Sequence, residues 1–194
     1  MVYGPKFAIS AAQHEAIIGR ETNFERKAYY RFCWFLGGTN SDMALLRAES
    51  IDWERRTVTF IKLKAKALCH PAFGSECAGV LGSLPSSGQL FSNLSTVRES
   101  DRATEFKHRC QGLGIEGSTL HSYRYAWAER AASAGMPERY AQAALGHGSK
   151  SVHRAYARRA ELHVPCLEEL TETRRMSIAK ARIEAGHQEF RVAA

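Results

Sequence analysis

The stretch HSYR at positions 121–124 is followed by LGH at 145–147 and by a tyrosine at 156. These segments place four polar side chains in order along the chain: His121, Arg124, His147 and Tyr156. An arginine guanidinium can bind two phosphate oxygens at once, and nearby histidines can donate or carry protons. A tyrosine hydroxyl can act as the nucleophile of a covalent intermediate. Together the four side chains predict phosphoryl transfer with Tyr156 as the attacking group.

A helix expected over residues 119–134 carries the first two of these groups. His121 and Arg124 are three residues apart, so they share one face of that helix. His147 is expected in a turn between two helices, where the flanking glycines let the backbone bend sharply. The residues expected to pack the opposite face of the first helix into the core are Leu120, Tyr123, Ala126 and Trp127.

The 194-residue chain carries a net charge of +7 and has a pI near 9.3. Such an excess of positive charge favours a polyanionic partner, nucleic acid first and an anionic membrane surface second. The sequence has no apolar run long enough to span a membrane and no signal-peptide pattern, so we expect a cytoplasmic protein. The five scattered cysteines lack any Cys-x-x-Cys pair, which favours buried free thiols over a zinc site or disulfides.

The chain is expected to be mainly helical with one small antiparallel β-sheet. A β-branched, alternating run over 57–63 predicts a strand, and residues 67–71 predict its partner. Ser10 with Gln13, and Thr22 with Glu25, have the spacing of capping boxes at helix starts. A short helix over 41–47 would give Met43, Leu45 and Leu46 to the core. The other expected helices cover residues 10–20, 24–36, 76–84, 97–112, 119–134, 137–145, 149–159 and 166–184.

The order and spacing of the polar residues resemble the tyrosine recombinase (phage integrase) family, whose signature is His-x-x-Arg, Leu-Gly-His and a nucleophilic Tyr. The resemblance covers roughly residues 7–160 and implies a site-specific recombinase or integrase acting on double-stranded DNA. By that resemblance Tyr156 forms a 3′-phosphotyrosyl link, and Arg124, His121 and His147 stabilise the pentavalent phosphate. It implies no metal and no cofactor.

The resemblance also divides the chain into a catalytic domain, residues 1–160, and a C-terminal tail with a helix, residues 161–194. In this family such tails often dock on a neighbouring protomer and couple the active sites of a tetramer. A homo-oligomer on DNA is therefore expected, although the tail could equally fold back on its own domain.

Three lysines surround the bend between the two expected strands. The family carries a lysine there that protonates the leaving 5′ oxygen. Lys64 is the best match for this role, with Lys62 and Lys66 as alternatives, and a solvated hairpin tip is the alternative without function. The basic residues expected to contact DNA are Lys62, Lys66, Lys150 and Arg154.

The sequence departs from the family pattern where the first catalytic arginine is expected. Residues 36–42 read LGGTNSD, and matching Ser41 to the family pattern puts Thr39 at the arginine position. A threonine hydroxyl brings no charge. Three explanations stay open: Arg31 or Arg47 fills the place, the enzyme works without it, or the chain binds DNA and no longer cuts it. Asp42 matches an acidic residue of the family and is expected to anchor this segment.

Two classes of function therefore stand: a DNA-cleaving recombinase, and a catalytically impaired or inactive DNA-binding protein on the same fold. The complete set of His121, Arg124, His147 and Tyr156 favours the first, and Thr39 favours the second. A strand-relaxing topoisomerase of related chemistry fits the Leu-Gly-His segment less well.

Overall fold

The computed structural model describes residues 7–62 and 67–160, together with six isolated helical positions farther on: Glu168, Thr171, Glu172, Arg175, Met176 and Ile178. The chain divides after Glu161 into two compact units. The first unit holds all the helices and strands named below. The expected helix over 166–184 lies largely outside the described residues. No helix in the described part of the chain is long and apolar enough to cross a membrane.

The N-terminal part of the first unit consists of three helices: α1 (Ala11–Arg20), α2 (Phe24–Leu36) and α3 (Asn40–Ala44). The capping box of Ser10 and Gln13 at the start of α1 is confirmed. The expected box of Thr22 and Glu25 is wrong, because Asn23 caps α2 by accepting a hydrogen bond from the Arg26 amide. The Glu25 carboxylate instead accepts hydrogen bonds from Asn93.

The β structure consists of two short antiparallel pairs rather than one hairpin. A 3₁₀ turn, η1 (Ala48–Ser50), leads into β1 (Ile51–Asp52), which pairs with β2 (Thr57–Val58), and β3 (Phe60–Lys62) pairs with β4 (Ala67–Cys69). The single strand expected over 57–63 is therefore broken at Thr59. At this residue the chain changes partner: the Thr59 amide bonds to the Ser50 carbonyl, whereas Val58 bonds to Pro71.

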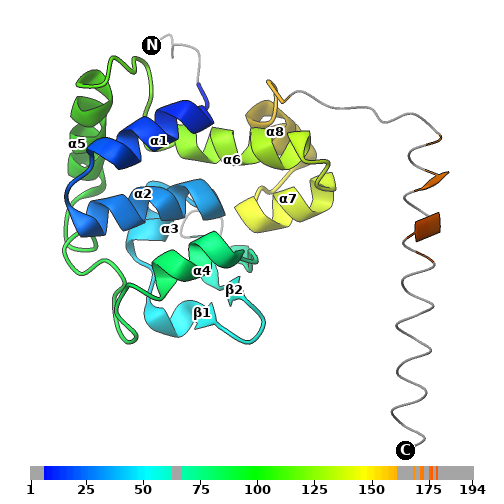
Figure 1. The fold of residues 1–194 in the computed structure, drawn as a ribbon, viewed down its shortest axis with the longest axis horizontal. Coiled ribbons are helices and arrows are strands. Elements are labelled where there is room, and N and C mark those ends of the chain that lie inside the picture. Colours follow the sequence, from blue (N-terminus) through cyan, green and yellow to red (C-terminus); the bar gives the residue numbers. More distant parts are fainter. Residues whose placement is uncertain are drawn as a thin grey trace, which may run out of the picture. The chain divides into compact units, whose positions relative to one another are not determined.

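Five helices follow: α4 (Ser75–Leu81), α5 (Glu99–Gln111), α6 (Ser122–Ser133), α7 (Glu138–Leu145) and α8 (Lys150–Tyr156). Each lies within the range expected from the sequence, or begins one residue before it. In Figure 1, α5 lies at one end of the first unit and α7 and α8 lie at the other, with α2 and α6 between them.

Helix α6 runs through the interior, and α2 packs against it. Its residues 122–128 are all buried, so this helix has no solvent-facing side over its first two turns. Tyr123 lies among the aromatic rings of Tyr30 and Phe106. The four expected core residues, Leu120, Tyr123, Ala126 and Trp127, are confirmed as buried.

Two smaller expectations about the core have different outcomes. Cys33, Cys69, Cys77 and Cys110 are buried free thiols, as expected, and Cys166 lies outside the described residues. Leu45 is 42% exposed, so its expected place in the core is wrong. It is the residue that caps the C-terminus of α3, where the chain leaves the helix and the side chain turns outward.

Candidate active site

A hollow of about 530 Å³ brings together side chains from five elements of the first unit. Its lining includes Thr39 before α3, Lys62 at the end of β3, His121 and Arg124 at the start of α6, and Tyr156 at the end of α8. Three of the four residues in the sequence signature therefore line one space. The fourth, His147, contacts the ring of Tyr156 from beside it.

Tyr156 and His121 are in direct contact. The His121 Nε2 atom lies 2.8 Å from the Tyr156 hydroxyl oxygen, which is hydrogen-bonding distance. The Tyr156 ring stacks on Tyr125, with 4.3 Å between the ring centroids, and Tyr125 also meets the edge of His121. His121 stands just before α6 and Tyr125 one turn inside it, so two side chains of this segment contact Tyr156.

Arg124 is only 1% exposed and is bound on both sides of its guanidinium group. Its Nη1 atom donates to the Gly37 carbonyl at 2.9 Å, and its Nη2 atom donates to the Leu145 carbonyl. Burial lowers the pKa of Arg124, and its contact with the Tyr156 hydroxyl opposes that shift. Two buried carbonyls thus hold the guanidinium beside Tyr156.

Gly37 makes this arrangement possible. It ends α2 in the left-handed region with φ of 62°, and an added Cβ would lie 2.6 Å from Trp127. A side chain there would therefore push α6 away from α2. Gly37 also presents its own carbonyl to Arg124.

His147 follows Gly146, which ends α7 in the left-handed region with φ of 60°. Its ring centroid lies 4.5 Å from that of Tyr156. Burial, reinforced by Arg124 and Lys62, lowers the pKa of His147 to about 3, so the imidazole is neutral near neutral pH. Its Nε2 atom is buried and has no hydrogen-bond partner among the described residues. A neutral imidazole can present that atom as a donor to a phosphate oxygen.

His153 is a neighbour of the site to which the sequence gave no role. It is buried on α8, and its Nδ1 atom lies 3.2 Å from the Nδ1 atom of His147. One ring must donate and the other accept, so His153 contributes to the tautomer of His147. Its position three residues before Tyr156 was the only sequence signal.

Thr39 serves as the N-cap of α3. Its hydroxyl accepts a hydrogen bond from the Asp42 amide, and the Asp42 carboxylate accepts one from the Thr39 amide. This capping box accounts for the anchoring role expected of Asp42. The hydroxyl of Thr39 is thus committed to its own helix, and it supplies no charge to the hollow.

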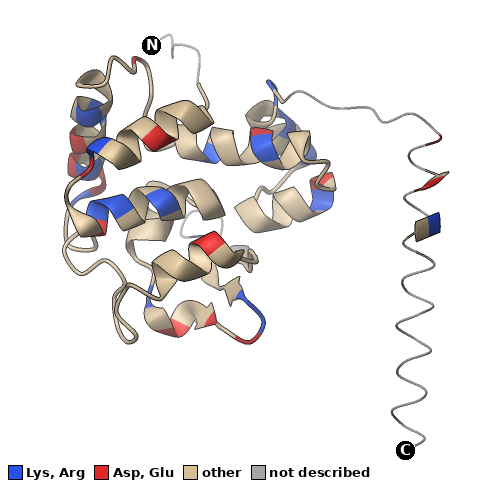
Figure 2. Ribbon diagram, in the orientation of Figure 1, with Lys and Arg blue, Asp and Glu red and all other residues tan. Residues whose placement is uncertain are grey.

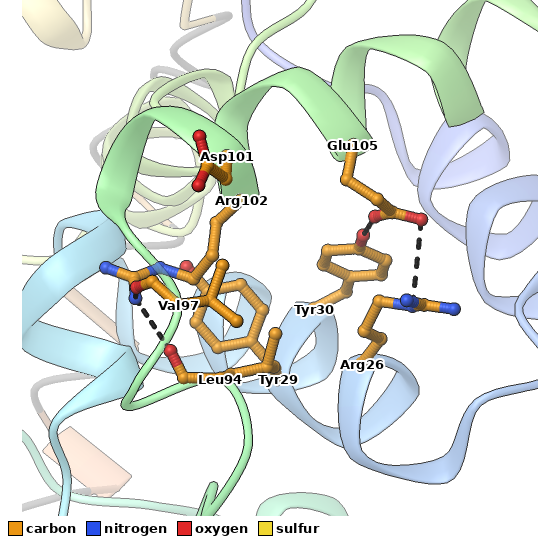
Figure 3. A pocket seen from close by; sticks show the side chains of 8 residues that line it. All are labelled: Arg26, Tyr29, Tyr30, Leu94, Val97, Asp101, Arg102 and Glu105. Carbon is orange, nitrogen blue, oxygen red and sulfur yellow. Dashed lines mark hydrogen bonds and ion pairs between the residues drawn. The ribbon is translucent and has the colours of Figure 1, made fainter.

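A second, smaller cavity of about 90 Å³ is lined by residues of α2, of α5 and of the segment just before α5 (Figure 3). Buried Arg102 donates to the Asn40 side chain and to the carbonyls of Leu94 and Val97. The Tyr29 hydroxyl donates to the same Asn40 side chain at 2.7 Å. These bonds hold the first residue of α3, and with it the Thr39 wall of the larger hollow.

The two arginines considered as replacements lie elsewhere. Arg31 lines a different hollow, beside His14 and Trp34. Arg47 is exposed and pairs with Glu49 at 3.2 Å. Neither side chain lines the hollow that contains Tyr156. Lys62 does line it.

The other basic residues predicted to act on DNA fall into two groups. Lys64 and Lys66 lie outside the described residues. Lys150 and Arg154 are exposed on α8, and Arg154 pairs with Glu138 at 3.0 Å. Figure 2 shows lysines and arginines on several separate elements, interspersed with acidic residues, rather than in one block.

Comparison with known proteins identifies the family and supports the fold. The model described as Phage integrase family matches residues 16–163. No curated protein matches the chain. The crystal structure of XerA recombinase superposes with a TM-score of 0.68 and 18% identity, over 90% of this chain and 65% of that one.

Two other solved structures are similar. A lambda integrase dimer bound to a COC′ core site gives a TM-score of 0.69 with 12% identity, over 86% of this chain and 53% of that one. The catalytic domain of bacteriophage HP1 integrase gives a TM-score of 0.64 with 17% identity, over 79% of this chain and 88% of that one. At these identities the likeness shows a shared fold. The chain spans less than two thirds of the XerA and lambda proteins but most of the HP1 catalytic domain.

Proposed function

The chain belongs to the phage integrase family, and from that premise we propose that it is a site-specific recombinase that cuts and rejoins double-stranded DNA. The observation that carries the proposal is the 2.8 Å contact of His121 with the Tyr156 hydroxyl, beside the buried guanidinium of Arg124. A phenol between a proton acceptor and a fixed cation is prepared for nucleophilic attack.

In the proposed reaction the Tyr156 oxygen attacks a DNA phosphorus, and the bond from phosphorus to the 5′ oxygen breaks. The phenolic proton passes to His121 Nε2, and Lys64 protonates the leaving 5′ oxygen. Arg124 and His147 donate hydrogen bonds to the non-bridging oxygens as negative charge develops. A 3′-phosphotyrosyl link results, and attack by a second 5′ hydroxyl reverses the step and joins the new strand.

A covalent trap tests this proposal. The protein is incubated with nicked duplexes of randomised sequence, from which a short cut strand diffuses away and prevents religation. Denaturing gels should show a protein–DNA adduct with the native chain and none with Tyr156→Phe. The matched control is Tyr140→Phe, at a tyrosine on α7 that is 54% exposed, and it should form the adduct normally. An adduct that persists in Tyr156→Phe would contradict the assignment of the nucleophile.

A second candidate function has one observation in its favour. Thr39 stands where the family carries an arginine, and its hydroxyl caps α3. The loss of one donor to developing charge typically costs about a hundred- to a thousandfold in rate. The second candidate is therefore a DNA-binding protein whose cleavage is impaired.

The same trap separates the two candidates when Thr39→Arg is included. An adduct from the native chain supports the recombinase. An adduct from Thr39→Arg alone supports the impaired protein, with fold and nucleophile intact. Retained DNA binding with no adduct from either chain supports a protein that only binds.

The assembly on DNA belongs to the same proposal. We expect a homo-oligomer, a tetramer in the complete complex, assembled through residues 161–194. Sedimentation of the DNA complex should show this assembly for the full chain and its loss for a chain ending at residue 160. An unchanged assembly would mean that the tail folds back on its own domain.

A further inference from the structure

We propose that Lys62 neutralises the same phosphate as Arg124, and so supplies the positive charge that Thr39 lacks. This inference rests on the proposed function and assigns Lys62 a place in the active site, where the sequence suggested only a contact to DNA or an alternative to Lys64.

Lys62 is the last residue of β3, and it lines the hollow. Its Nζ atom donates a hydrogen bond to the Gly146 carbonyl at 3.1 Å. Gly146 directly precedes His147, so this bond joins β3 to the turn that carries the second histidine. The side chain is half-buried and lines the hollow together with Thr39, Arg124 and Tyr156. Lys62 is therefore held in the site rather than extended into solvent.

The ammonium of Lys62 and the guanidinium of Arg124 affect each other. Burial lowers the pKa of Lys62, and Arg124 lowers it further. Two partly desolvated cations facing one space repel each other, and that cost is recovered when an anion enters. The pair thus favours an anion in the hollow.

The acidic side chains of the hollow are bound to other groups. The Asp42 carboxylate accepts from the Thr39 amide, and the Glu99 carboxylate accepts from the Ser41 hydroxyl at 2.9 Å. Asp42 offsets part of the effect of Arg124 on the pKa of Lys62, as does the buried thiol of Cys69. Neither carboxylate forms an ion pair with Lys62 among the described residues. The two cations therefore keep most of their charge available for a phosphate.

An ammonium suits this task. It has three N–H donors, of which Gly146 takes one, and two are left for non-bridging phosphate oxygens. The hydroxyl of Thr39, which accepts in the cap of α3, has a single neutral O–H donor and brings no positive charge. The role is electrostatic, and Lys62 transfers no proton in it.

A double-mutant cycle between protein and DNA tests this role without any cleavage. All proteins carry Tyr156→Phe, and the DNA is a duplex selected from a random pool by its binding. One uncharged methylphosphonate is stepped along each strand, and affinity is measured at constant salt. Lys62→Gln should weaken binding by about tenfold, as expected for one charged hydrogen bond. That loss should vanish when the methylphosphonate occupies one particular position.

The position of the methylphosphonate at which each loss of affinity vanishes decides whether the two cations bind one phosphate. Arg124→Lys is measured in the same series. The loss of affinity that it causes should vanish when the methylphosphonate occupies the same position. Coupling of Lys62 and Arg124 to one phosphate supports the proposal even if no adduct ever forms, so it stands apart from the trap. Coupling to different phosphates, or no coupling of Lys62 to any, overturns it. Lys107→Gln, an exposed charge on α5, is the matched control and should show no position-dependent coupling.

Cleavage chemistry separates this role from that of a general acid. In the catalytic protein, a substrate with sulfur in place of the leaving 5′ oxygen needs no proton donor, because a thiolate is a good leaving group. Lys62→Gln should remain slow on this substrate, and Lys62→Arg should recover part of the rate on ordinary DNA. If Lys62→Gln cleaved the sulfur-containing substrate at the full rate, Lys62 would be the general acid, and the proposal would be overturned.

Discussion

Two walls of the hollow around Tyr156 use their polar side chains in opposite ways. On the α6 wall, His121 and Arg124 extend from a buried helix and contact Tyr156. On the α3 wall, Thr39 and Asp42 bond to each other's backbone amides at the start of a five-residue helix. The polar side chains of the α6 wall face Tyr156, whereas those of the α3 wall form the cap of their own helix.

This difference shows how the same site can keep its chemistry and lose a charge. The α6 wall is held by core packing, and its His121 and Arg124 side chains face Tyr156. The α3 wall is a single helix of five residues, and the capping box of Thr39 and Asp42 stabilises its start. Its polar side chains stabilise the helix end, and the nearest additional cation comes from β3 instead.

The largest effect is expected on the α6 wall, from Arg124→Lys. A lysine keeps the charge but cannot donate to Gly37 and Leu145 at once, so one buried carbonyl loses its partner. We expect a loss of about 2–3 kcal/mol in the free energy of unfolding, measured by urea denaturation. Adduct formation should slow by about a hundredfold or more.

The matched control is Arg139→Lys, at an exposed arginine on α7 that contacts the Tyr140 hydroxyl and ring. Its effect on stability should stay within about 0.5 kcal/mol. Equal effects of the two substitutions would mean that the guanidinium bonds do not hold the α6 wall.

A smaller effect is expected when the solution is acidified. His14 is 3% exposed, bonds to Tyr123 of α6 at 3.2 Å, and has its pKa lowered to about 4, mainly by burial. The unfolded chain binds this proton near pH 6.5. Stability should therefore be complete above about pH 6.5 and fall progressively toward about pH 4. The loss from His14 should reach about 2–3 kcal/mol near pH 4.5, and burial of His147 acts in the same direction.

Urea denaturation at a series of pH values checks this prediction. His14→Gln should be less stable at neutral pH, because it loses the stack on Trp34, but its stability should depend less on pH. His108→Gln, at an exposed histidine of α5, should keep the full slope. An unchanged slope in His14→Gln would place the acid-sensitive group elsewhere.

The smallest effect is expected on the α3 wall. Thr39→Ala removes the acceptor for the Asp42 amide and should cost about 1 kcal/mol in the free energy of unfolding. Thr39→Ser keeps the acceptor and should restore most of that stability. If alanine and serine were equally stable, the cap would not be what holds this wall, and the contrast with α6 would fail.

Much of the fold followed from local patterns. Most helix ranges, the glycine end of α7 and the buried residues of α6 were predicted because they depend on neighbouring residues. The errors occurred where a distant partner decided the outcome. Asn23 replaced Thr22 as a cap while Glu25 bonded to Asn93, and the strand at Thr59 broke where it exchanged partners.

The candidate site shows the same division. The sequence by itself determined the order HSYR, LGH and Tyr156, and with it the chemistry of a cation, two imidazoles and a phenol. Only the tertiary structure decided that Lys62 enters the site, that Arg31 and Arg47 do not, and that Thr39 is a cap. The physical reason is distance along the chain: residue type and local periodicity specify what a side chain can do, but packing of α2, β3, α6 and α8 specifies what it faces.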